Sequence, residues 1–307
     1  MGLSRKLLLA ASQSRWMRER ATRMKFVRKS VSRFMPGEAL DDALRAGAEL
    51  ATRNLGTTLT HLGENVADAK EAQAVTDHYQ EVLRRIAAEQ PRTEISVKLT
   101  QLGLDLSEEL CENNLRVLLA ACPATSGVFV DMEYSQYVDA TLRIYRRVLA
   151  DFPRTGICLQ AYLPRTADDL RELLPLRPSV RLVKGAYSEP PSVALQQKRA
   201  IDDNYLALAQ ELLCRRGTGE VTRVIFASHD APLIARITRF AELQRAAKES
   251  VEFQMLYGIR TDELARLSSE GWPCSSLIAY GEYWYPWFVR RLAERPANVW
   301  FVLKNLT

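Results

Sequence analysis

The stretch that decides the fold is GICLQAYLPRTADDLRELLPLRPSVRLVKGAY, residues 156–187. It begins with a short apolar run at residues 157–162, continues through a segment of helical spacing at residues 167–174, and ends in a second apolar run at residues 180–186. Two strands with one helix between them indicate parallel strands joined by a crossover, because a tight hairpin cannot make that connection. The same alternation repeats from about residue 55 onward.

Short apolar, β-branched runs of this kind predict eight strands. They lie at residues 57–60, 94–100, 128–132, 157–162, 180–186, 224–229, 252–257 and 275–280. The segments between them predict helices at residues 68–89, 107–121, 135–150, 167–174, 192–216, 231–248 and 261–270. Ser107, Thr166 and Thr261, each followed by acidic residues, are the start signals of three of these helices. Eight strand–helix units predict an α/β fold, the closed (β/α)8 barrel.

The alternative architecture is an open, doubly wound sheet. Such a sheet favours a glycine-rich phosphate turn after its first strand, and neither GxGxxG nor GxxxxGK[ST] occurs in the chain. We therefore favour the barrel.

The charge of the chain is concentrated at one end. The 307 residues are 47% apolar and 26% charged, which is typical of globular proteins and excludes disordered and collagen-like classes. Residues 1–33 hold ten basic residues and one acidic residue, a charge of +9, which leaves −4 of the net +5 for the rest of the chain. We predict a basic N-terminal helical arm at residues 1–54, broken at Pro36-Gly37, and a barrel domain at residues 55–307.

The arm also suggests where the protein acts. Its Lys and Arg residues alternate with apolar residues such as Trp16 and Phe26, a pattern typical of an amphipathic helix on an anionic membrane surface. A solvated arm packed on the barrel is the alternative. No apolar run is long enough to span a membrane, and five dispersed cysteines without a CxxC pair indicate a reducing compartment. We expect a cytoplasmic protein with peripheral contact to the inner face of the cell membrane.

Polar residues cluster where the predicted strands end, which is where catalytic groups lie in such barrels. They are Lys98, Asp131, Gln160, Arg181, Lys184, Ser228 and His229. A simple alternative is a set of rim ion pairs, in which Lys98 and Asp131 neutralise each other. Five strands with such residues favour a ligand site, because charges in a barrel mouth are costly unless they are paired or bound.

The segment after the last strand, residues 281–295, combines aromatic residues with Arg290 and Arg291. Glu294 lies on the same helical face as both arginines. Paired guanidinium groups bind a carboxylate or phosphate, so we expect this C-terminal helix to hold them over the barrel mouth; a surface helix with ordinary ion pairs is the alternative. The chain has no HExxH motif, no closely spaced histidine pair and no GxSxG motif, so no metal site is expected, and nucleic-acid binding is not indicated.

Seven segments together resemble the bacterial proline dehydrogenases. They are SVKLTQLGLDL (96–106), VFVDMEYS (128–135), LQAYLPRT (159–166), RLVKGAYSEP (181–190), FASHD (226–230), FQMLYGIR (253–260) and YPWFVRRLAERPAN (285–298). The resemblance implies a (β/α)8 barrel that binds FAD. It also implies oxidation of proline, or a proline-like cyclic secondary amino acid, to the imine by hydride transfer to flavin N5, with a quinone or another acceptor taking the electrons.

The resemblance also implies roles for individual residues. Asp131 and Arg181 would be catalytic. Lys98, Arg290 and Arg291 would hold the substrate carboxylate, with Leu256 in the pocket wall. The implied FAD contacts are Met132, Gln160, Lys184, Gly185, Ala186, Tyr187, Ser228 and His229.

The chain departs from the family pattern in its last strand. Leu277 stands where the family has a tyrosine that packs on the substrate ring, and Ala279 stands where it has a proline. Tyr280 is at an odd offset from Leu277, so its ring is expected to face the other way. One alternative is therefore a hydroxylated or otherwise modified proline as substrate. A degenerate, non-catalytic barrel and a barrel enzyme for phosphorylated substrates are two further alternatives, disfavoured by the retained charged residues and by the lack of glycine-rich phosphate loops.

Overall fold

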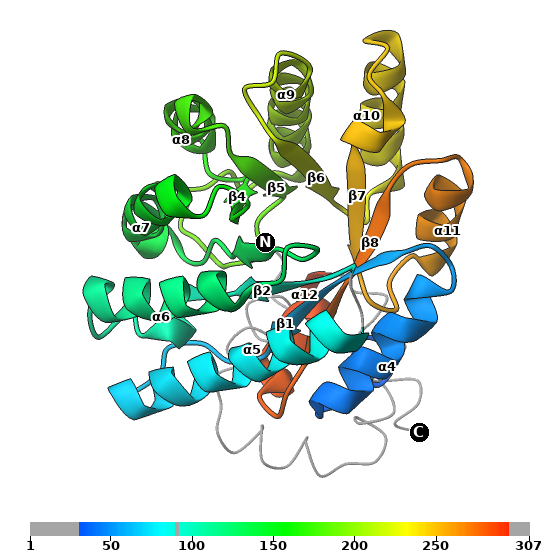
Figure 1. The fold of residues 1–307 in the computed structure, drawn as a ribbon. Helices are drawn as coiled ribbons and strands as arrows, with labels where there is room; N and C mark the ends of the chain where they lie inside the picture. The colour runs from blue at the N-terminus through cyan, green and yellow to red at the C-terminus, as the bar shows by residue number, and fades with distance from the viewer. Residues whose placement is uncertain (1–30, 90–91, 295–307) are drawn as a thin grey trace.

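The computed structural model describes residues 31–89 and 92–294. Its eight strands run parallel and close into one barrel in sequence order, with β1 paired to β8 (Figure 1). The strands are β1 (Gly56–His61), β2 (Thr93–Val97), β3 (Val128–Val130), β4 (Gly156–Gln160), β5 (Ser179–Val183), β6 (Arg223–Ala227), β7 (Glu252–Leu256) and β8 (Cys274–Tyr280). The predicted (β/α)8 barrel is confirmed.

Helices surround the barrel and bury its outer face. They are α4 (Leu40–Ala51), α5 (Ala69–Glu89), α6 (Glu108–Ala121), α7 (Val138–Asp151), α8 (Thr166–Leu173), α9 (Lys198–Gly217), α10 (Ala231–Leu243) and α11 (Thr261–Ser269). The last described helix, α12 (Trp284–Glu294), packs in a separate apolar cluster. Outward strand residues such as Leu59, Ile95 and Phe226 are fully buried in the core between strands and helices. Within the described ranges, no helix carries an apolar stretch long enough to cross a bilayer.

The three predicted helix starts lie at the observed boundaries. The Ser107 hydroxyl accepts a hydrogen bond from the Leu110 amide at 3.4 Å and caps α6. The helices α8 and α11 begin at Thr166 and Thr261 without a side-chain cap. The Thr166 hydroxyl instead donates to the Gln160 carbonyl at 2.6 Å and fixes the turn between β4 and α8.

Several predicted element ends are wrong. The ladder of β2 ends at Val97, and residues 99–102 form a 3-10 turn, so the predicted strand at 94–100 runs too far. The helix predicted at 192–216 begins only at Lys198, because Pro190 and Pro191 lead into a turn. The helix predicted at 231–248 ends at Leu243, since Arg245 takes a left-handed backbone conformation (φ 52°) that stops it.

The segment before α4 packs on α12. Val31 and Met35 form a second apolar cluster with Trp284, Phe288 and neighbouring residues of α12, and with Ala279 of β8. The Trp284 indole donates to Glu38 at 2.9 Å. α4 itself packs on β1 and β8 and contributes Ala43 and Leu44 to the main core. The predicted arm is therefore, over its described residues, packed on the barrel; residues 1–30 lie outside the described part of the chain.

Candidate functional site

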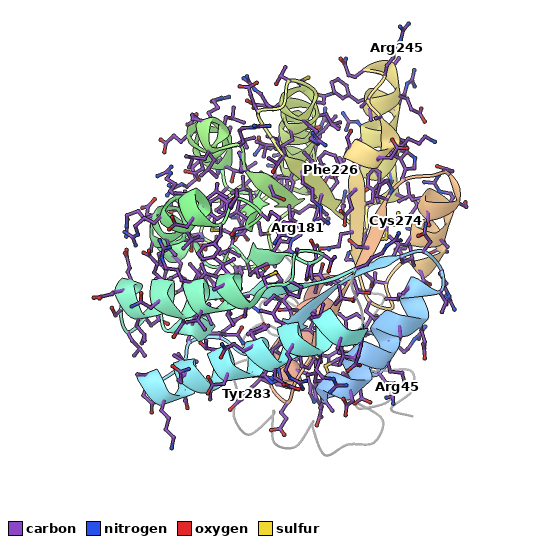
Figure 2. The ribbon with its side chains drawn as sticks, in the orientation of Figure 1. Arg45, Arg181, Phe226, Arg245, Cys274 and Tyr283 are labelled. Carbon is purple, nitrogen blue, oxygen red and sulfur yellow. The ribbon has the colours of Figure 1, made fainter. Side chains whose placement is uncertain are left out.

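An ion pair lies at the centre of the barrel. The Arg181 side chain is only 2% exposed and lies inside the ring of strands (Figure 2). It forms an ion pair with Asp131, the first residue after β3. Ser96 of β2 joins the two, because its hydroxyl lies 2.7 Å from the Asp131 carboxylate and 2.7 Å from Arg181 Nη2. Burial opposes the charge on Arg181, but Asp131 outweighs it, so the pKa of Arg181 is raised.

A second polar layer lies deeper in the barrel. Gln254 of β7 accepts from Arg181 Nη1 at 3.3 Å and donates to the hydroxyls of Thr58 and Ser275 at 3.0 and 3.1 Å. Ser275 in turn donates to Glu252 at 2.6 Å. Below this layer, Arg223 forms ion pairs with Glu94 and Glu252.

Phe129 separates the two arginines of the interior. The guanidinium carbons of Arg181 and Arg223 lie 5.1 and 5.5 Å from the centre of its ring. A Cβ atom on Gly156 of the next strand would lie 2.3 Å from the ring. Glycine at position 156 therefore gives Phe129 the space to insert between the cations, where both gain a cation–π contact.

Lys98 is a buried cation that has no carboxylate partner among the residues that the structure describes. It keeps an extended backbone after β2, so its side chain follows Glu94 and Ser96 on the interior face. The residue is only 9% exposed, and among the described residues no carboxylate oxygen lies within 4.0 Å of its ammonium group. The alternative in which Lys98 and Asp131 neutralise each other is therefore wrong, because Asp131 pairs with Arg181 instead. Lys98 is left able to bind an anion.

The loop after β3 is held by buried hydrogen bonds. Glu133 accepts from the Thr100 amide at 3.1 Å and from its hydroxyl at 2.7 Å. Burial raises the pKa of Glu133 to about 7. The Gln160 amide donates to the Glu133 carbonyl at 2.8 Å, and Met132, which directly precedes Glu133, is buried. Met132 and Gln160, two implied cofactor contacts, are thus brought to one end of the barrel.

Lys184 lies in a compact charge network. Its ammonium contacts Asp202 of α9 and lies 2.8 Å from Asp230, and Lys198 contacts the same two carboxylates. Burial opposes the ionised form of Asp230, but hydrogen bonds from the two lysines outweigh burial, and its pKa is strongly lowered. This network ties together the ends of β5, β6 and α9.

The backbone after β5 makes a close turn. Gly185 has a φ of 117°, and a Cβ atom there would lie 2.2 Å from the Tyr162 ring. Ala186 and Tyr187 follow, and the Tyr187 ring packs on Tyr134 with their centroids 4.4 Å apart. Position 185 therefore requires glycine, because the Tyr162 ring fills the space that a side chain would take.

The loop after β6 is also ordered. His229 Nε2 accepts from the Leu256 amide at 3.0 Å, so in the neutral ring the proton lies on Nδ1. The Ser228 hydroxyl accepts from the Asp230 amide at 3.2 Å. Both side chains therefore serve loop geometry, with His229 directed across to the end of β7.

Leu256 and Leu277 are partners in the register of β7 and β8. They lie two residues beyond Gln254 and Ser275, so they face the same interior above the polar layer. Tyr280 points outward, where its hydroxyl lies 2.7 Å from His78 Nε2 of α5. The prediction that Tyr280 faces away from Leu277 is confirmed. Arg290 and Arg291 lie in α12, and their side chains are outside the described part of the structure.

Sequence reasoning missed the deeper polar layer. Ser96, Gln254, Glu252 and Arg223 were not identified, although β7 alternates the polar residues Glu252 and Gln254 with Phe253 and Met255. That period of two, in a strand expected to be buried on both faces, is the signal that could have found them.

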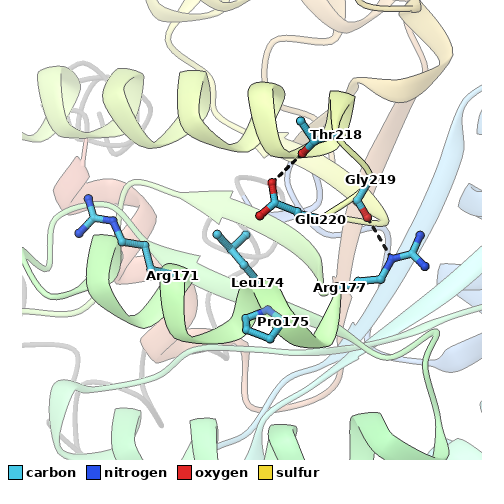
Figure 3. Close-up of a pocket in the computed structure, with 7 residues that line it drawn as sticks. All are labelled: Arg171, Leu174, Pro175, Arg177, Thr218, Gly219 and Glu220. Carbon is cyan, nitrogen blue, oxygen red and sulfur yellow. Dashed lines mark hydrogen bonds between the residues drawn. The ribbon is translucent and has the colours of Figure 1, made fainter.

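A surface depression lies away from this site (Figure 3). Its lining comes from α8 and the turn after it, which precede β5, and from residues 218–220, which precede β6. Arg177 donates to the Gly219 carbonyl at 3.0 Å, and Thr218 donates to Glu220 at 2.7 Å. The depression is therefore at the end of the barrel opposite Lys98 and Asp131.

Comparison with known proteins gives consistent matches. The model of the proline dehydrogenase family matches residues 43–304. Proline dehydrogenase 1 of Bacillus subtilis is 38% identical over 280 residues, which cover 91% of each chain. The proline dehydrogenase of Deinococcus radiodurans is 34% identical over 280 residues, 89% of each chain.

Solved structures agree with these matches. The crystal structure of proline utilization A from Bdellovibrio bacteriovorus, inactivated by N-propargylglycine, superposes with a TM-score of 0.81 and 26% identity. The match covers 87% of this chain and 33% of that one. This chain therefore spans about a third of the length of that structure.

Proposed function

The chain belongs to the proline dehydrogenase family, and from this premise we propose that it oxidises proline to the imine with FAD as its cofactor. The observation that carries the proposal is Lys98, a buried ammonium with no carboxylate partner in the described part of the chain, on the strand next to Asp131 and its partner Arg181. Oxidation of a modified proline and a non-catalytic barrel are not favoured, because the relatives are proline dehydrogenases over nearly their whole length.

Lys98 would bind the substrate carboxylate, because a buried cation gains most from a charged partner. Arg290 and Arg291 of α12 would complete this anion site. Leu256 and Leu277 would form the apolar wall against the substrate ring, since both face the interior above Gln254. This arrangement orients an amino acid with its charged end toward Lys98 and its ring toward the leucines.

The residues around the mouth fit a flavin. Arg181 supplies a fixed cation, and Gln160 and His229 supply polar groups at the ends of their strands. The proposed FAD contacts are Met132, Gln160, Lys184, Gly185, Ala186, Tyr187, Ser228 and His229. FAD, when bound, supplies a hydride acceptor for the carbon next to the proline nitrogen. Asp131 holds Arg181 in place, and Arg181 stabilises negative charge that develops during the reaction.

The test is anaerobic titration of the purified protein with L-proline while its flavin absorbance is followed. We expect bleaching, and Lys98→Met should raise the KM for proline roughly 10- to 100-fold, as expected for loss of a hydrogen bond to a charged group. Lys70→Met, an exposed lysine of α5, is the matched control and should leave KM unchanged. A protein without flavin, or an unchanged KM in Lys98→Met, would refute the proposal.

We further propose that a quinone takes the electrons, that the protein is cytoplasmic, and that the basic arm contacts an anionic membrane. The boundary at residue 54 between arm and FAD-binding barrel stays a proposal. Deleting residues 1–30 tests the membrane contact and keeps Val31, which packs with α12. Sedimentation with anionic vesicles should fall in the deletion variant, and equal sedimentation would contradict the proposal.

A further inference from the structure

We propose that Gln254, in the middle of β7, is a positioning residue that holds the Arg181 guanidinium in its working orientation. The inference rests on the proposed function, in which Arg181 faces the flavin. Gln254 is 2% exposed and lies deeper in the barrel than Arg181. It is therefore not placed to contact a ligand in the mouth of the barrel itself. Its effect on the reaction would pass through Arg181.

The hydrogen bonds determine how the Gln254 amide is turned. Ser275 gives its hydroxyl proton to Glu252, at 2.6 Å, so its oxygen can only accept from Gln254 Nε2. Thr58 accepts from the same nitrogen at 3.0 Å. With both amide protons used, the carbonyl oxygen of Gln254 must face Arg181, which it does at 3.3 Å.

This contact complements the Asp131 pair. Asp131 and Ser96 hold Nη2 of Arg181, whereas Gln254 holds Nη1. Because a guanidinium group is planar, acceptors at two of its nitrogens set the plane as well as the position. Without Gln254, one buried N–H of Arg181 would lose its acceptor, and the guanidinium plane would be free to turn about Nη2, which Asp131 and Ser96 still hold.

Glu252 supports Gln254 indirectly, by accepting the hydrogen bond that fixes the Ser275 hydroxyl. Arg223, which also pairs with Glu94, forms an ion pair with Glu252 and so holds its carboxylate in place as the acceptor for Ser275. The chain of contacts from Arg223 through Glu252, Ser275 and Gln254 therefore gives Arg181 an anchor in the floor of the barrel.

The test compares amide-to-acid substitutions in the FAD-loaded protein. Gln254→Glu places a negative charge against Arg181 and should make the flavin harder to reduce. We expect its equilibrium constant for reduction to fall about 10-fold, or about 30 mV for a two-electron couple. Asn114→Asp is the matched control, because Asn114 is a buried amide of α6 that donates to the Leu102 carbonyl outside the barrel. It should lower thermal stability and leave the flavin potential unchanged.

A second variant removes the acceptor without adding charge. Gln254→Met should lower kcat for proline oxidation about 10-fold and change KM less than two-fold, because Arg181 turns while the Lys98 site stays intact. If Arg181→Met shifts the potential but both Gln254 variants match the unsubstituted protein, the inference is wrong and the proposed function stands. If Arg181→Met leaves the potential unchanged, the proposed role of Arg181 and this inference fall together.

Discussion

Substituting Asp131 by Asn should destabilise the protein strongly, because it leaves the Arg181 charge buried without its counter-ion. Arg181 is 2% exposed, and the Asp131 side chain is 18% exposed. Breaking a buried pair on one side costs about 3 to 5 kcal/mol, and we take about 3 because Asn keeps one acceptor oxygen for Arg181. At about 2.1 cal/mol/K per residue, the unfolding entropy of the chain is about 0.6 kcal/mol/K. The expected loss is therefore about 5 °C in Tm.

The assay is thermal unfolding followed by circular dichroism. Asp139→Asn is the control, since its side chain is 66% exposed and pairs with Arg165 on the surface, where a pair contributes about 0 to 1 kcal/mol. The double variant Asp131→Asn with Arg181→Met should recover part of the loss, because no unpaired charge remains. If Asp131→Asn unfolds within about 1 °C of Asp139→Asn, the reasoning from buried charge is refuted.

Two further predictions test other parts of the site. Gly185→Ala should lower both Tm and the fraction of bound FAD, because its Cβ would meet the Tyr162 ring. Gly271→Ala, also at positive φ but with no atom nearer than 3.8 Å, should lower Tm only through backbone strain and should leave the fraction of bound FAD unchanged. Burial and, after it, the charges of His78 and Lys98 lower the pKa of His61 to about 4. Below about pH 6.5 the unfolded chain binds a proton at His61 that the folded chain does not bind until about pH 4, so the free energy of unfolding decreases as the pH is lowered. Urea unfolding should show that, from pH 7 to pH 5, the free energy of unfolding of the wild type decreases by about 2 kcal/mol more than that of His61→Asn. An equal decrease in the two proteins would contradict the assignment to His61.

The fold was predictable because the strands of a barrel are buried on their outer face. Runs such as VRLV in β5 and VIFA in β6 are apolar on that face, and each is followed by a helical segment. The ends were less predictable. Lys98 and Asp131 continue the extended backbone after the ladder has ended, so the local pattern does not show where pairing stops.

The site was predictable as a set of strand ends but not as a set of partners. Adjacent strands favour Lys98 as the partner of Asp131, yet Arg181 reaches it from β5 across the barrel interior. The sequence shows which strands follow one another, but it does not show which side chains are long enough to meet across the barrel interior. The role of Gln254 was hidden for the same reason, since its partners Thr58 and Arg181 lie on β1 and β5.

The pairing of β1 with β8 has a consequence for how the protein is made. Residues Gly56–His61 hydrogen-bond to strand residues up to Tyr280, so the first strand has an unpaired edge until the ribosome has released the last one. Contacts between such distant segments form slowly, and an open strand edge attracts other chains. Fast expression without chaperones should therefore favour aggregates of nascent chains, whereas barrel closure protects the edge once β8 has paired with β1.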